Sequence, residues 1–284
     1  MTALWRRNLL VFFRDRVSVF FSFLGVIVII GLYVLFLGDL MLSDMSGIPG
    51  SRFLMDSWIM AGMLAATGVT TTLGALGTMV TDRAQGITRD LSATPISRRA
   101  LAGSYVAGAY VIGVLLTLVS LVFAELYIVA YGGRLLPAGA LCKLLGLILL
   151  SVFASSGPLF FLTTFLKSTS AFATVSTILG TLIGFLTGIY IPIGSLPAAV
   201  QFVVKAFPIS HAGVLFRQVM MEVPLAASFA AAPPEALSDF RTEMGVVFLS
   251  GETEIPWGVS VLILLATGFV FYLLSVARLS KKRD

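Results

Sequence analysis

Residues 81–104 read TDRAQGITRDLSATPISRRALAGS, a short charged segment in an otherwise strongly apolar chain. Six charged side chains lie within residues 82–99, and 25 uncharged residues flank that segment on each side, at 57–81 and 100–124. Charged side chains are costly in hydrocarbon, whereas uncharged runs of this length suit a bilayer. We therefore expect this segment to stand in water between two membrane spans.

The composition is that of an integral membrane protein. The 284 residues are 58% hydrophobic and only 12% charged, with a mean hydropathy of +1.00. Soluble domains carry about 25% charged residues, so the sequence predicts an all-α membrane protein without a sizeable soluble domain. Cys142 is the only cysteine, which excludes an intrachain disulfide and a multi-cysteine metal site. We expect no metal site.

Uncharged runs divide the chain into predicted membrane helices. A crossing takes about 20 helical residues, and backbone groups in lipid must be satisfied within the helix. The uncharged part of the first span exceeds the 7–15 apolar residues of a secretory signal, so this segment is expected to be retained. The six predicted spans are 17–38, 57–81, 100–124, 144–166, 170–191 and 256–277.

Prolines mark a break after the fifth span. Residues 192–211 are predicted to form an external re-entrant hairpin, whose half-depth helix, at about 18 Å, is too short to cross. Residues 212–255 then form the largest external loop, with a short surface helix at 235–247. The residues that mark the hairpin are Pro192, Pro197, Pro208 and His211.

The distribution of basic residues predicts the orientation of the chain in the membrane. Thirteen of the 19 flank one set of loops together with both termini, and six flank the other set. Basic residues are retained on the cytoplasmic side of a membrane. We therefore predict a multi-pass protein of the cell (inner or plasma) membrane, with both termini and residues 82–99 in the cytoplasm.

Residues 1–16 form a separate element. On a helical wheel Trp5, Leu9, Phe12 and Phe13 share one face, while the opposite face is polar. This pattern predicts an interfacial helix on the cytoplasmic leaflet; the alternative is a frayed basic tail attracted to anionic lipid. The polar face consists of Arg7, Asn8, Arg14 and Asp15.

The sequence lacks the motifs of several enzyme classes. There is no G-x-x-x-x-G-K-[ST], H-E-x-x-H or G-x-S-x-G, so the chain is expected not to be an enzyme and to have no catalytic residues. It would bind no cofactor itself, and any ATP and magnesium would sit on a partner ATPase. The centres of the predicted spans carry no charge, which argues against an ion-coupled secondary carrier. That carrier class remains an alternative.

Small residues recur in two spans. Gly180, Gly184 and Gly188 are spaced by four residues, which lets helix backbones approach closely. They predict either a subunit interface or pathway-lining seam, or packing within one subunit. Thr70 and Thr71 are candidates to face a translocation pathway, although such residues also hydrogen-bond helix backbones.

A protease is the other alternative. Ala154-Ser155-Ser156-Gly157 approximates the G-x-S-G of rhomboid-type intramembrane proteases, with His211 as the partner base. Alanine replaces the first glycine of that motif, and His211 follows the predicted hairpin rather than lying in the last span.

The charged segment resembles the cytoplasmic loop between spans two and three of ABC-2 type transporter permeases. The family pattern is roughly acidic-basic-x-x-Gly-x-x-basic-Asp-x-x-x-(Ser/Thr)-Pro-(Ile/Val)-x-Arg. Arg14-Asp15 and the stretch 191–217 resemble the family's basic segment before span one and its external hairpin. Residues 86–89, Gly-Ile-Thr-Arg, depart from the common Gly-Thr-Leu-Glu. The matching positions are Asp82, Arg83, Gly86, Arg89, Asp90, Thr94, Pro95, Ile96 and Arg98.

The resemblance implies partners and a direction. It implies a homodimer, or a pair with a close relative, bound to two cytoplasmic ATPase subunits, with no nucleic-acid partner. Residues 82–99, here named the coupling loop, would supply a coupling helix that docks on the ATPase. The loop arginines would pair with acids on that partner or only touch lipid phosphate. The implied activity is export of an amphipathic substrate (drug, antibiotic or lipid-like), as in multidrug efflux.

Overall fold

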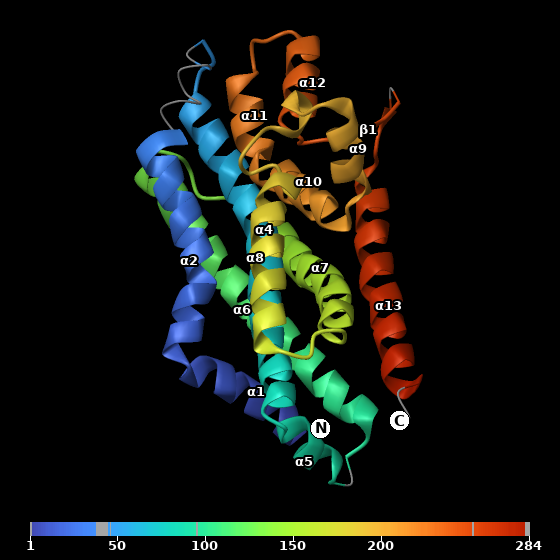
Figure 1. The fold of residues 1–284 in the computed structure, drawn as a ribbon. Coiled ribbons are helices and arrows are strands. Elements are labelled where there is room, and N and C mark those ends of the chain that lie inside the picture. Colours follow the sequence, from blue (N-terminus) through green and yellow to red (C-terminus); the bar gives the residue numbers. More distant parts are fainter. Residues whose placement is uncertain (1, 38–44, 46, 95, 252, 282–284) are drawn as a thin grey trace.

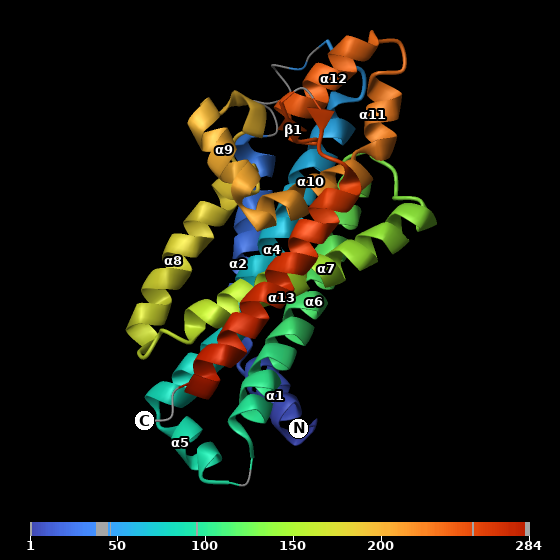
Figure 2. The same ribbon diagram turned by 90° about the vertical axis from the view of Figure 1, so that its right-hand side faces the viewer.

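The computed structural model describes residues 2–37, 45, 47–94, 96–251 and 253–281. Long helices form a bundle, and shorter helices form a cap at one end (Figures 1 and 2). We call the end that carries α1 and α5 the loop end, and the end that carries α9, α11 and α12 the cap end. The predicted all-α class is confirmed.

Seven helices build the bundle and its connection to the N-terminus. Their bounds differ from the predicted ranges because charged residues at several helix ends continue the helix instead of stopping it. The bounds are α1 Thr2–Arg14, α2 Arg16–Leu32, α4 Ser51–Ala84, α6 Arg98–Ala130, α7 Ala138–Thr163, α8 Thr169–Leu186 and α13 Trp257–Lys281.

The remaining elements are short. A π-helical turn, η1, continues α2, and the two strands pair as an antiparallel hairpin in which Leu249 faces Glu254. The bounds are η1 Tyr33–Leu37, α5 Ile87–Ser92, η2 Ile193–Ser195, α9 Ala198–Ala206, α10 Pro208–Met220, α11 Glu222–Ser228, α12 Pro234–Glu243, β1 Leu249–Ser250 and β2 Thr253–Glu254.

Five described helices are long and apolar enough to cross a membrane: α4, α6, α7, α8 and α13. The pair α9 and α10, bent by 90°, makes a sixth if it is counted as one span. In the predicted first span the apolar helix is Ser22–Leu35, and residue 38 lies outside the described residues. The chain is therefore a multi-spanning membrane protein with five to six candidate spans.

Helix α4 is the centre of the bundle, and α8 lies at its edge (Figure 2). In α4, 89% of the most apolar window is buried, against 11% in α8. Helix α4 packs against α6, α7, α10 and α8, and its small residues allow close approach. Helix α8 instead leaves most of its surface uncovered in a single chain.

The cap differs from the predicted hairpin and loop. The predicted boundary at residue 211 falls inside α10, which runs unbroken to Met220 and is largely buried against α4, α7 and α13. Its apolar residues, such as Val214, Leu215 and Phe216, lie inside the protein. Helix α9 has nine residues and, at 1.5 Å per residue, spans about 14 Å.

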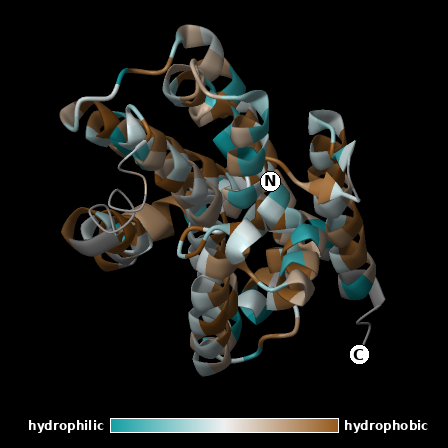
Figure 3. Cartoon of the chain, turned by 90° about the horizontal axis from the view of Figure 1, so that it is seen from above, coloured by the Kyte–Doolittle hydropathy of each residue, from teal (hydrophilic) through white to brown (hydrophobic). Residues whose placement is uncertain are grey.

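Apolar residues cover much of the outside of the bundle. Figure 3 shows them on helices all around the periphery, and the exposed ones include Leu126, Phe202, Leu262, Phe269 and Leu273. A soluble protein rarely exposes contiguous apolar surface of this extent. The exposed side chains therefore suit hydrocarbon rather than water.

Helix α1 is oriented differently from the wheel-based prediction. Asn8, assigned to the polar outer face, is buried against α6, where a side chain at Gly108 would lie 3.2 Å from the Asn8 Cβ. Leu10, Val11 and Phe13 are instead exposed. Tertiary contacts thus turn Arg7 and Asn8 toward the bundle, while Arg14 is exposed and Phe12 of the apolar face is buried. A wheel of one helix does not contain these contacts.

Candidate coupling site

The coupling loop forms a short helix at the extreme loop end of the bundle (Figure 1). Helix α4 ends at Ala84, and Gly86 turns the chain with φ of +81° before α5 begins. Glycine adopts this left-handed conformation without steric cost. The Ser97 hydroxyl then accepts a hydrogen bond from the Ala100 amide at 3.2 Å and caps α6. Pro95 lies outside the described residues.

The coupling loop has an outer and an inner side. Arg89, Asp90 and Thr94 are exposed, whereas Leu91 and Ile96 are partly buried and pack against the main core. The apolar side therefore holds the loop on the bundle, and the charged side points away from it. These exposed groups are available for a partner.

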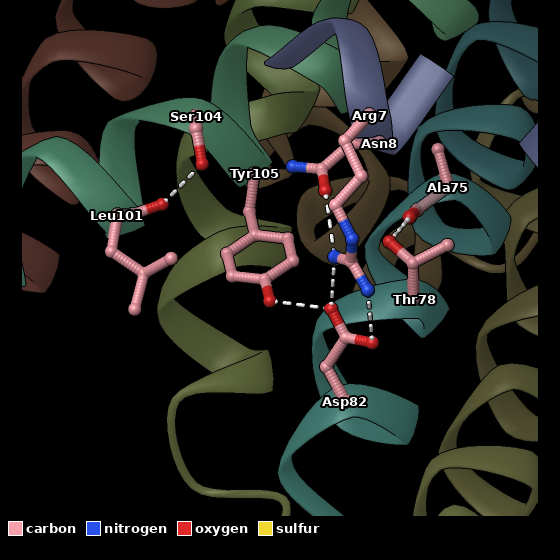
Figure 4. Close-up of polar contacts among 8 residues, drawn as sticks. All are labelled: Arg7, Asn8, Ala75, Thr78, Asp82, Leu101, Ser104 and Tyr105. Atoms are coloured by element: carbon pink, nitrogen blue, oxygen red, sulfur yellow. Dashed lines mark hydrogen bonds and ion pairs between the residues drawn. The ribbon is translucent and has the colours of Figure 1, made fainter. Parts of the chain in front are cut away.

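Asp82 does not share that exposed surface. Its carboxylate accepts two hydrogen bonds from the Arg7 guanidinium, at 2.6 and 3.0 Å, and one from the Tyr105 hydroxyl at 2.6 Å (Figure 4). Only 5% of Asp82 is exposed. The two bonds from Arg7 are bidentate, the strong geometry for this pair. The hydrogen bond to Asp82 raises the pKa of Arg7.

The Asp82 contacts connect three helices. Arg7 comes from α1, Asp82 from the end of α4 and Tyr105 from α6. Because the carboxylate is buried, removal of one partner leaves a charge without compensation. The base of the coupling loop is therefore fixed to α1 and α6.

Arg83 points to another part of the bundle. Its Nη1 donates to the Leu166 carbonyl at 2.8 Å and lies 3.3 and 3.4 Å from the carbonyls of Thr163 and Thr164. Thr163 and Thr164 stand at the C-terminus of α7, where a cation is favourable, and Leu166 lies in the turn that follows. Arg83 thus holds the turn between α7 and α8. Among the predicted coupling positions, Arg89, Asp90 and Thr94 are thus exposed, whereas Asp82 and Arg83 point into the bundle.

The two threonines predicted to line a pathway differ in exposure. Thr71 is buried and donates to the Thr67 carbonyl at 2.7 Å, while Thr70 is exposed and donates to the Ala66 carbonyl at 3.2 Å. Both hydroxyls bond to their own helix. Thr70 alone of the two faces the surroundings of the chain.

The three glycines of α8 and its end have different neighbours. The Tyr190 ring covers Gly184, and Gly188, with φ of +68°, lies against Ile193 and Arg217. Gly180 has open space where a side chain would stand. Packing within the chain therefore accounts for Gly184 and Gly188, and only Gly180 is free to contact another subunit.

A cavity of about 490 Å³ lies at the loop end between α1, α4 and α8. Its lining includes apolar residues, such as Phe12 and Phe172, and polar or charged residues, such as Arg7, Asp15 and Thr78. The cavity thus offers both kinds of surface that an amphipathic molecule requires.

The prolines of the predicted hairpin stand at helix starts. Pro192 precedes η2, Pro197 precedes α9, and Pro208 is the first residue of α10. Proline suits such positions because it has no amide hydrogen to leave unpaired. His211 is buried in α10, and its ring nitrogens lie 3.0 Å from the Ser260 hydroxyl and 3.0 Å from the Lys205 carbonyl.

Ser156 and His211 do not form the catalytic pair that the protease alternative requires. The hydroxyl of Ser156 donates to the Phe153 carbonyl at 2.8 Å, and His211 is engaged with Ser260 and Lys205. Gly157 faces Gly268, whose carbonyl oxygen would lie 2.6 Å from an added Cβ. The Ser-Gly pair therefore serves the packing of α7 against α13.

Several polar residues with structural roles were missed by the sequence analysis. Arg217 is completely buried, and Asp56, 1% exposed, lies within α4 and 3.4 Å from Arg52. Glu125 is also buried, where it accepts a hydrogen bond from the Leu136 amide. The longer α4 thus contains a carboxylate that the uncharged run excluded. An arginine in the apolar surroundings of α10 was the one available signal for Arg217.

The fold and the coupling loop define a class of protein. It is a multi-spanning membrane protein with a short helix at one end, in a loop whose base is attached to the bundle. The profile of the ABC-2 type transporter family matches residues 1–221, so the chain belongs to this family. It is the membrane-spanning permease part of an ABC transporter, and permeases of this family work with ABC ATPase partners. No curated protein matches the chain.

Proposed function

We propose that this permease is the transmembrane subunit of an exporter driven by separate ATPase subunits, and that α5 is the coupling helix. The observation that carries the proposal is the two-sided coupling loop. Arg89 and Asp90 are exposed, while the base of the loop is fixed by the contact between Asp82 and Arg7. A force on the outer side therefore reaches the bundle instead of only bending the loop.

The proposed docking surface carries one positive and one negative side chain on a short helix. Arg89 and Asp90 are adjacent and exposed, and Thr94 follows on the same exposed segment. Complementary charges on an ATPase surface would fix the register of docking, and a wrong alignment would bring like charges together. This supports protein contact for Arg89, whereas Arg83 is engaged with the carbonyls of α7 and the α7–α8 turn.

Two routes lead from the coupling loop into the bundle. Asp82 connects it to α1, and through α1 to α2. Arg83 connects it to the turn that precedes α8. We propose that ATP binding on the partner moves α5 and that both routes carry this motion to the helices beside the pathway.

The pathway is proposed to lie along the uncovered face of α8, where two copies of the chain, or this chain and a close relative, meet. Thr174, Thr177 and Thr181 are exposed along this helix, and Gly180 is open. The amphipathic cavity near Phe172 offers an inner-leaflet entrance for an amphipathic substrate. The excess of basic residues at the loop end supports a cytoplasmic location for both termini in the cell membrane.

One element of the predicted re-entrant hairpin, the short helix α9, is part of this proposal. Helix α9 is too short to cross, and its exposed residues Val200, Phe202 and Val203 are apolar. We propose that α9 dips into the outer leaflet. Helix α1 likewise exposes Leu10 and Phe13 to the inner leaflet, which supports its assignment as an interfacial helix.

Charge reversal in α5 tests the docking. In lipid nanodiscs with the co-purified ATPase, Arg89→Glu with Asp90→Lys is expected to lower partner binding and permease-stimulated ATP hydrolysis at least tenfold, because one buried charge pair contributes several kcal/mol. The matched control, Arg134→Glu with Glu235→Lys, reverses exposed charges at the cap end and is expected to leave both values unchanged.

Two results would contradict the proposal. Unchanged stimulation in the α5 variant would exclude α5 as the docking element. Substrate movement that follows a proton or sodium gradient without any ATPase would assign the chain to the carrier class. The buried Asp56 is the residue whose substitution by asparagine would then be expected to abolish transport.

A further inference from the structure

Arg217 is a buried cation that the proposed transport route does not use. Its side chain is 0% exposed. Within the described residues, no carboxylate is ion-paired with it. A buried charge is retained only where other groups replace its hydration, so the surroundings of Arg217 must supply this compensation.

The compensation comes from the end of α8. Arg217 Nη2 donates to the Thr187 carbonyl at 2.6 Å and to the Gly188 carbonyl at 3.0 Å. These carbonyls follow directly on the last residue of α8, where the helix dipole is negative. About two turns earlier along the same face of α10, Ser210 donates to the Leu186 carbonyl at 2.7 Å. Helix α10 therefore caps the C-terminus of α8 with two side chains.

The turn after α8 is built for this contact. The Gly188 and Ile189 amides donate back to the Phe185 and Gly184 carbonyls, at 3.1 and 2.9 Å. This is the helix-ending arrangement that requires a residue with positive φ, and Gly188 has φ of +68°. The arrangement directs the next carbonyls away from α8, where Arg217 receives them.

The rest of the guanidinium contacts α4 and the segment after α12. Its Cζ lies 4.8 Å from the centre of the Trp58 ring, and Nη1 lies 3.5 Å from the Gly245 carbonyl. Gly62 leaves the necessary room, because an added Cβ there would stand 3.2 Å from Nη2. Arg217 thus contacts α4, the end of α8 and the segment after α12 at the same time.

Helix α8 has little other attachment. Only Ile183 and Gly184 of its residues are buried, and both lie in its last turn. At the other end Arg83 holds the preceding turn through Leu166, and Phe172 rests on Gly77. The cap end of α8 is thus fixed to the core, whereas the loop end is connected to the base of the coupling loop through Arg83.

We propose that Arg217 is a positioning residue that fixes the cap end of α8, so that α8 turns about this point when the coupling loop moves its loop end. This inference rests on the proposed function for the motion, but the fixed point itself rests only on the contacts of Arg217. A lysine carries the charge but lacks the planar fork that reaches separate carbonyls and stacks on Trp58.

Hydrogen–deuterium exchange on the full-length permease in lipid nanodiscs tests the fixed point. In Arg217→Met, the amides of Thr187, Gly188 and Ile189 are expected to exchange at least tenfold faster, because loss of a charged hydrogen bond promotes local opening by about this factor. Arg217→Lys is expected to give an intermediate rate. The control Arg241→Met removes a partly exposed cap-end guanidinium that is paired with Glu254 and is expected to leave these rates unchanged.

A milder variant covers the case in which Arg217→Met does not fold. Ser210→Ala removes one cap and retains the charge, and it is expected to raise exchange at the same amides by a smaller factor. Unchanged exchange in Arg217→Lys and Ser210→Ala, with both proteins folded, would overturn the proposal.

The motion is tested in the complex with the ATPase, with and without ATP. In the wild type, ATP is expected to change exchange in residues 169–177 and to leave residues 183–189 unchanged. In Arg217→Lys, the response is expected to spread to residues 183–189. An equal response of both segments in the wild type would exclude the fixed point. A lack of any response to ATP would contradict the proposed function, while the exchange rates of the permease alone would still decide whether Arg217 positions α8.

Discussion

Asp82 and Arg83 are neighbours in the sequence whose side chains hold opposite parts of the bundle. The Asp82 carboxylate lies 2.6 Å from the Arg7 guanidinium of α1, and Arg83 donates to the Leu166 carbonyl at 2.8 Å. Successive residues of a helix point about 100° apart. Asp82 and Arg83 at the end of α4 therefore reach different neighbours, α1 and the α7–α8 turn. The coupling loop thus begins at a point with two attachments.

The Arg7–Asp82 contact is expected to contribute to both stability and coupling. Arg7→Gln should lower the free energy of unfolding by about 1–3 kcal/mol, since Asp82 is buried while Arg7 remains partly exposed and screened. Thermal unfolding of the purified permease measures this loss. Arg6→Gln is the matched control, because Arg6 is exposed on the same helix.

A double-mutant cycle separates the pair from its surroundings. Arg7→Gln and Asp82→Asn together should cost less than the sum of the single changes, because the double variant leaves no unpaired buried charge. Additive losses would show that the two side chains do not interact in the membrane.

Gly86 is expected to control the orientation of α5. Gly86→Ala places a Cβ at φ of +81°, which costs about 1–2 kcal/mol even though nothing lies within 4 Å of it. The turn is expected to relax by moving α5, so stimulation of the ATPase should fall while the permease still folds. ATP hydrolysis of the reconstituted complex measures the effect.

Gly132→Ala provides the control for this strain. Gly132 has φ of +87° and equally open surroundings, but it lies between α6 and α7, away from the coupling loop. It should show a similar stability loss with normal stimulation. Equal loss of stimulation in both variants would mean that backbone strain, and not the position of α5, is responsible.

The sequence predicted the features that depend on charge and on span length. The charged segment at 82–99 does separate two long apolar helices, and a short helix lies inside it. These features follow from the cost of charge in lipid, which acts on each residue separately. Helix bounds were less predictable, because Asp56 and Glu125 are helical and buried. Asp56 lies near Arg52 of the same helix, and Glu125 accepts a hydrogen bond from the Leu136 amide.

The roles of individual residues depend on tertiary contacts and were not predictable. Arg7 was predicted to lie on the polar face of an interfacial helix, and its contact with Asp82 was missed because Asp82 lies 75 positions away. Arg217 was predicted to lie in the external loop 212–255. In the structure it belongs to α10, which runs through the predicted boundary at 211. Its acceptors are backbone carbonyls, which leave no trace in residue identity.

Gly180 is expected to mark the contact between two permease copies. Gly180→Leu adds a side chain where the single chain has open space, so the fold should persist while the dimer fraction falls several-fold. Photobleaching step counts in nanodiscs measure that fraction. Gly146→Leu, at an equally open position on α7, should leave it unchanged, and an unchanged fraction in Gly180→Leu would exclude the α8 face as the interface.

Gly157 and Ser156 are adjacent residues for which opposite outcomes are expected. Gly157→Ala would place a Cβ 2.6 Å from the Gly268 carbonyl oxygen, and such overpacking between α7 and α13 should cost about 1–3 kcal/mol. Ser156→Ala removes only a hydroxyl bonded to its own helix and should change stability by less than about 0.5 kcal/mol. Thermal unfolding of both variants provides the comparison. A larger loss in Ser156→Ala than in Gly157→Ala would show that the hydroxyl, and not the close approach of the helices, is what this position requires.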